Sequence, residues 1–178
     1  SRLLVRVLRQ ALKVYDRVAR DYEQQKPFVD VRLAGLHARL GEILAKRPFG
    51  SPDDMKLSME YRIDAADKFL AVAKENPGSP YDEDSLVQSG DLFMGVGSYE
   101  RAVEGYTIFT MRHGRSELVG RVRNQLGTAY MKLGLFERAE TAFRANASDS
   151  TTAEGRKGLY NLGMNYLRND PAGWTVGV

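Results

Sequence analysis

The residue types that most often carry out chemistry are few in this chain and are not grouped. His37 and His113 are its two histidines, and the 178 residues contain no cysteine. His37 falls in a leucine-rich stretch and His113 precedes Gly114, and neither has a companion at the spacing of metal ligands or of an acid–base pair. The lack of cysteine excludes disulfides, thiol nucleophiles and cysteine-based metal sites.

Two short motifs begin like binding loops but lack essential parts. The acidic run 82–84 has the spacing of a calcium loop without its glycine and final glutamate, and acids in a first helical turn are explained by the helix dipole. The segment 95–99 starts like a phosphate-binding glycine loop but lacks the third glycine and a preceding strand. We therefore predict no catalytic, cofactor-binding or metal-binding residue and a protein that is not an enzyme, unless further sequence supplies a catalytic domain.

Composition and charge are those of a folded protein with alternating blocks of charge. The chain is 43% hydrophobic and 28% charged, and no apolar run is long enough to span a bilayer. The net charge is +6 over residues 1–50, −7 over residues 51–110 and +4 over residues 111–178. Such a layout can attract charged partners, although the outer faces of packed helices often carry charge only because they face water.

Hydrophobic spacing predicts helices along most of the chain. The predicted helices cover residues 3–23, 28–47, 53–76, two segments between 82 and 111, two between about 115 and 146, and 153–169, with Asp53 or Asp54 as an N-cap. The first helix has a basic stripe, which would suit an anionic lipid, a nucleic acid or an acidic partner, or would simply be a solvated face. The stripe consists of Arg2, Arg6, Arg9, Lys13, Arg17 and Arg20.

A repeat of small and aromatic residues organises the second half of the chain. Gly127 and Ala139 are small enough to let two antiparallel helices approach, Phe143 fills the space beside them, and Gly134 can end the first helix in the left-handed conformation. The pattern recurs 37 residues earlier, and its first residues recur 36 residues later. Gly41 occupies the place that corresponds to Gly90 in the unit before that. The matching residues are Gly90, Phe93, Gly97, Tyr99, Ala102 and Tyr106, and then Leu162, Gly163 and Tyr166.

This unit resembles the tetratricopeptide repeat (TPR), whose signature places Leu-Gly-x-x-Tyr before Ala and an aromatic residue on two helices. The resemblance implies an all-α fold, a right-handed α-α superhelix of stacked helical hairpins. The lengthened units are similar to those of bacterial envelope TPR proteins, namely outer-membrane assembly lipoproteins and Tol–Pal coordinator proteins, which favours the periplasm or cell envelope. One array over 1–178 would comprise a partial repeat at 1–25, repeats at 28–77 (with an insertion at about 48–59), 81–113 and 115–150, a half repeat at 153–170 and a tail at 171–178.

The resemblance also implies a function, because the first helices of TPR units line a concave groove. We expect a non-catalytic scaffold, a subunit or assembly factor of a larger complex, that binds an extended or acidic protein segment and reaches a membrane only through a partner. Helix packing is the alternative role for the methionines, and nucleic-acid binding through the basic ends is the alternative function. The expected groove residues are Arg121, Asn124, Thr128, Met131, Lys157, Tyr160 and Met164, and no cofactor is expected.

The predicted array ends in half a unit, so one helix should carry an apolar face without its partner helix. Stacked repeats usually end in polar capping elements. We therefore expect further residues or a partner protein to cover this face.

Overall fold

The computed structural model describes residues 2–21, 26–47 and 51–169, and this part of the chain is helical with no strand. The all-α prediction is confirmed for these residues, whereas the superhelical stacking and the single array remain predictions. The contacts divide the chain into two compact units, residues 1–98 and 99–178. The helices are α1 (Arg2–Asp21), α2 (Lys26–Ala45), α3 (Pro52–Glu75), α4 (Asp82–Gly95), α5 (Tyr99–Arg112), α6 (Val119–Lys132), α7 (Phe136–Ala147) and α8 (Ala153–Asn169).

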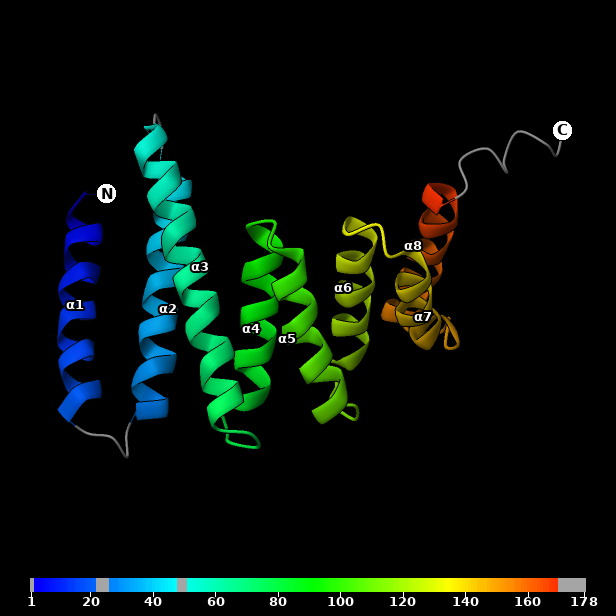
Figure 1. Ribbon diagram of the computed structural model, residues 1–178, viewed down its shortest axis with the longest axis horizontal. Helices are drawn as coiled ribbons and strands as arrows, with labels where there is room; N and C mark the ends of the chain where they lie inside the picture. The colour runs from blue at the N-terminus through cyan, green and yellow to red at the C-terminus, as the bar shows by residue number, and fades with distance from the viewer. Residues whose placement is uncertain (1, 22–25, 48–50, 170–178) are drawn as a thin grey trace, which may run out of the picture. The chain divides into compact units, whose positions relative to one another are not determined.

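In the first unit, α1 to α4 lie side by side and successive helices run in opposite directions (Figure 1). Apolar residues on one side of α2 face α1 and are removed from water, which supplies most of the driving force for this packing. Leu33, Leu40 and Leu44 of α2 form this core with Val5 and Leu12 of α1. The regularly spaced leucines of the predicted helix 28–47 therefore lie on the buried face of α2.

The start of α3 differs from the sequence prediction. Its N-cap is Ser51, whose hydroxyl accepts from the Asp54 backbone N–H at 3.2 Å, while the Asp54 carboxylate accepts from the Ser51 backbone N–H. The assignment of Asp53 or Asp54 as the N-cap was wrong, because Asp54 fills the third helical position of this capping box. Pro52 begins the helix, where its missing N–H removes no hydrogen bond.

The predicted insertion at about 48–59 mostly lengthens a helix. Residues 52–59 belong to α3, while residues 48–50 lie outside the described residues. As a result α3 has 24 residues, compared with 14 in α6 and 12 in α7. Pro52 lies in the first turn of α3, where a proline commonly marks the start of a helix. Pro27 likewise lies at the beginning of α2.

His37 lies half-buried between α2 and α3, beside the Tyr61 ring and in contact with the Asp64 carboxylate through Nδ1. Burial lowers the pKa of His37 below its ordinary value of 6.5, and the opposing effect of Asp64 is smaller. The folded protein therefore binds a proton at this position less readily than the unfolded chain does.

We expect the stability contributed by neutral His37 to be complete above about pH 6.5 and to fall as the pH is lowered through its depressed pKa. Urea unfolding of the wild type and of His37→Gln at several pH values between 7.5 and 5 measures this effect. As the pH is lowered over this range, the free energy of unfolding should decrease less for the variant than for the wild type. Parallel losses would show that burial of His37 does not contribute to acid sensitivity.

In the second unit, α6 packs on α5, α7 and α8. An added Cβ at Gly127 would lie 2.4 Å from Cε1 of Phe143, so this glycine lets the aromatic ring of α7 rest directly on the α6 backbone. Phe143 and Ala139 are completely buried. The predicted close approach of two antiparallel helices at Gly127 is confirmed.

Gly97 and Gly134, 37 residues apart, end α4 and α6 in the same way. Their φ angles are 80° and 73°, in the left-handed region that glycine adopts without steric cost. The next residue in each case donates its N–H to a carbonyl five residues back, Ser98 to Phe93 and Leu135 to Tyr130, both at 2.9 Å. These are Schellman caps. The two turns are therefore equivalent in hydrogen bonding as well as in sequence.

Candidate functional site

A hollow of about 220 Å³ lies between α6 and α8, within the second unit. Residues one turn apart point to the same side of a helix, so Thr128 and Met131 of α6 face it together, as do Tyr160 and Met164 of α8. These four residues were expected to line a groove, and the structure brings them together. The complete lining is Thr128, Met131, Lys132, Tyr160, Asn161, Met164 and Arg168.

The hollow combines adaptable apolar side chains with a cationic rim. Met131 and Met164 are partly buried, whereas the Tyr160 side chain is 68% exposed. Lys132 and Arg168 are both exposed at the edge, each in the last turn of its helix. Methionine adjusts to irregular apolar shapes, and tyrosine offers a flat apolar face with a polar end. Such a lining suits an apolar side chain flanked by negative charge.

Asn124 is placed differently from the prediction. It is completely buried, and its Nδ2 donates to the Glu154 backbone carbonyl at 3.0 Å and to Oε2 of the Glu154 side chain at 2.7 Å. It cannot contact a partner in the groove, because it holds the start of α8 against α6. The register of the repeat gave no indication of this role, since the partner lies 30 residues away. We therefore correct Asn124 from a groove residue to a structural one.

Two other asparagines of this unit make the same kind of bond. Asn146 Nδ2 donates to the Gly120 carbonyl at 2.6 Å, and Asn165 Nδ2 donates to the Phe136 carbonyl at 2.9 Å. Both asparagines are buried. Each of these amides donates to a carbonyl in the first turn of a helix and so fixes one helix relative to the next. The sequence signal for them is an asparagine within an apolar helical face.

The predicted cations Arg121 and Lys157 do not line the hollow. Each lies seven residues before a lining residue of its own helix, Arg121 before Thr128 and Lys157 before Met164. Arg121 is partly buried and Lys157 is exposed. The positive charges next to the hollow are instead Lys132 and Arg168, which the sequence analysis did not select.

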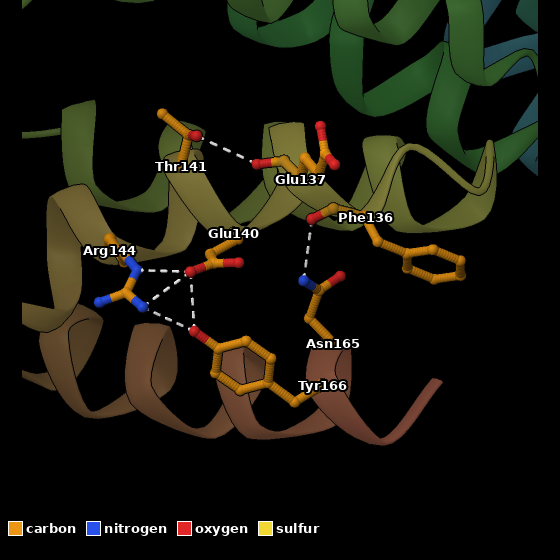
Figure 2. Close-up of polar contacts among 7 residues, drawn as sticks. All are labelled: Phe136, Glu137, Glu140, Thr141, Arg144, Asn165 and Tyr166. Atoms are coloured by element: carbon orange, nitrogen blue, oxygen red, sulfur yellow. Dashed lines mark hydrogen bonds and ion pairs between the residues drawn. The ribbon is translucent and has the colours of Figure 1, made fainter. Parts of the chain in front are cut away.

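A polar cluster holds α8 against α7 beside the Asn165 bond (Figure 2). Arg144 donates to Glu140 Oε1 and to the Tyr166 hydroxyl, and that hydroxyl donates to the same Glu140 oxygen, with all three distances 2.7 Å. The hydrogen bond from Tyr166, and next that from Arg144, lowers the pKa of Glu140. Donation to Glu140 raises the pKa of Tyr166. The cluster fixes the rotation of α8, which also carries Tyr160 and Met164.

A metal site and a membrane-spanning helix are both absent from the part of the chain that the structure describes. Residues 2–21, 26–47 and 51–169 contain no group of three or more histidine or acidic side chains that could hold a metal ion. Within the same ranges, no helix has the length and apolar character needed to cross a membrane. No protein-family model matches the chain, and no curated protein matches its sequence.

Proposed function

We propose that this protein is a non-catalytic, TPR-like interaction module that binds a segment of another protein in the hollow between α6 and α8. The observation that carries the proposal is the combination of Met131, Met164 and the exposed Tyr160 ring in one hollow with a cationic rim. At about 220 Å³ the hollow is smaller than typical small-molecule sites, which start near ~300 Å³. It accommodates a side chain of a partner segment better than a whole metabolite.

The charges specify the partner segment. Lys132 and Arg168 would attract carboxylates on either side of an apolar anchor, so the ligand is an extended segment with acidic residues around one large apolar residue. The equivalent Schellman turns at Gly97 and Gly134 support repeated helical hairpins, and hence a scaffold role as a subunit or assembly factor. On this proposal the protein works in a bacterial periplasm or cell envelope and meets a membrane only through its partner.

We expect Tyr160→Ala to weaken binding of such a segment by about 30-fold, since loss of a central interface aromatic commonly costs ~2 kcal/mol. The assay is fluorescence anisotropy with a library of labelled peptides that place one aromatic or leucine residue between glutamates. The binding peptides are selected on the wild type and measured again on the variant. Unchanged affinity for Tyr160→Ala would refute the hollow as the binding site.

Charge reversal at the rim gives a graded version of the same test. Lys132→Glu combined with Arg168→Glu should weaken binding more than Arg121→Glu combined with Lys157→Glu, because the latter pair lies outside the hollow. Lys46→Glu combined with Lys56→Glu is the matched control, a pair of exposed lysines of the first unit with the same total change of charge. Equal effects of all these variants would show that only the net charge of the protein matters.

A further inference from the structure

The first unit contains a larger hollow, of about 570 Å³, with a cationic wall that the proposed function does not use. It lies where the N-terminal half of α1 meets the end of α2 and the start of α3, and these helix ends lie together in Figure 1. Val5 and Leu44, both buried, form an apolar floor. The complete lining is Val5, Arg6, Arg9, Gln10, Lys13, Leu44, Arg47 and Asp54.

The acid in this hollow is fully used by its neighbours. One oxygen of the Asp54 carboxylate accepts from Arg47 Nη1 at 2.7 Å, and the other accepts from the Ser51 backbone N–H at the start of α3. The charge of Asp54 is thus matched by Arg47, and its lone pairs are directed at the α3 cap. The Asp54 carboxylate therefore does not neutralise the other positive side chains of the hollow.

Arg6, Arg9 and Lys13 have no acidic partner among the residues that the structure describes. They follow one another at spacings of three and four residues, so their charges share one face of α1 and repel each other. Asp16, three residues after Lys13, does not line the hollow. An anion bound among these three side chains would remove the repulsion, as an acidic side chain does in an ordinary ion pair.

We propose that this hollow is a binding site for a compact anion bearing phosphate groups. Two guanidinium groups present planar pairs of N–H donors that match phosphate oxygens, Lys13 adds a third positive charge, and Gln10 adds a neutral donor. Its volume falls within the range of small-molecule sites. The anion is either a free phosphate compound or a phospholipid headgroup, since both present the same group to these side chains.

The test uses the full chain with two probes, inorganic tripolyphosphate in solution and vesicles of phosphatidylcholine with or without phosphatidic acid. Calorimetry and vesicle co-sedimentation are compared for the wild type and for Arg6→Gln combined with Arg9→Gln, which should weaken binding at least about tenfold. Arg17→Gln is the matched control, an exposed arginine of the same helix outside the hollow, and should change binding less than about twofold. Lys13→Gln, measured separately, should weaken binding without disturbing the two arginines, and circular dichroism checks that each variant folds.

The two probes separate the sources of the phosphate group. Saturable binding of tripolyphosphate that depends on Arg6 and Arg9 supports a free anion, and the same dependence for the acidic vesicles alone supports a lipid headgroup. Binding of neither probe overturns the proposal. An equal loss from Arg17→Gln also overturns it, because polyanions would then bind along the whole basic face of α1, as in the nucleic-acid alternative.

Discussion

Replacing Gly127 by alanine should destabilise the protein by about 1–3 kcal/mol, although alanine normally favours a helix. The new methyl group would lie 2.4 Å from Cε1 of Phe143 and 2.7 Å from both Cδ1 and Cζ. Phe143 is completely buried, so its ring cannot move out into solvent. Relief of the overlap therefore requires the ring to displace its buried neighbours or α6 and α7 to move apart. Urea unfolding followed by circular dichroism measures the change.

Gly163→Ala provides the matched control, because Gly163 is 36 residues after Gly127 in the same Leu-Gly-x-x-Tyr pattern. An added Cβ there has no atom within 4 Å, and Gly163 is exposed in the middle of α8. We expect this substitution to stabilise the protein by about 0.5–1 kcal/mol through the usual advantage of alanine over glycine in a helix. If both variants were equally stable, the contact between Gly127 and Phe143 would be refuted.

This pair of glycines shows how far sequence register predicts local structure. Gly41, Gly90 and Gly127 are all buried, and Gly41, like Gly127, lies where an added Cβ would strike the next helix, there at Arg62 and the Ser58 carbonyl. Gly163 shares the pattern but lies in open space, on a helix face that exposes further apolar residues. These exposed residues are Leu159, Tyr160, Tyr166 and Leu167. Register thus predicts which side of a helix is suited to a partner helix, but not whether a helix among the described residues covers that side.

The helix ends at Gly97 and Gly134 could be predicted because their cause is local. A residue without Cβ at that position permits the positive φ, and the carbonyls of the preceding turn then accept the next N–H groups. The start of α3 has an equally local cause, but the sequence prediction considered only Asp53 and Asp54 as its N-cap. Ser51 accepts from Asp54 and donates its own N–H to the Asp54 side chain, and only this reciprocal pair distinguishes the cap from its neighbours.

Asn124 could not be assigned from the sequence, because its partner is remote. The repeat pattern places position 124 on the groove side of α6, and that side is covered at this level by the first turn of α8. The polar character of asparagine suggested exposure, whereas its amide serves the Glu154 carbonyl inside the unit. The hollow begins at Thr128, one turn later, where α6 and α8 leave room between methionines. The candidate site is consequently shorter than the sequence analysis indicated, and its charges come from Lys132 and Arg168.

Phe143→Ala should be the most damaging single change, with an expected loss of about 3–5 kcal/mol. The ring is completely buried, and its removal leaves a cavity between Gly127 and the α7 backbone. Because α7 also carries Glu140 and Arg144, which hold Tyr166 of α8, looser packing of α7 should release α8 as well. Phe143→Leu, which retains most of the volume, should lose much less. Chemical unfolding of each variant gives these differences.

The double variant, Gly127→Ala with Phe143→Ala, tests whether the two residues act through one contact. Once the ring is removed, the methyl group at position 127 no longer overlaps anything and partly fills the cavity, so the double variant should be more stable than the sum of the single effects predicts. Residues in contact give interaction energies of about 0.5–3 kcal/mol in such a cycle. Additive effects would mean that the ring does not rest on the glycine, and the packing of α6 against α7 would then need another explanation.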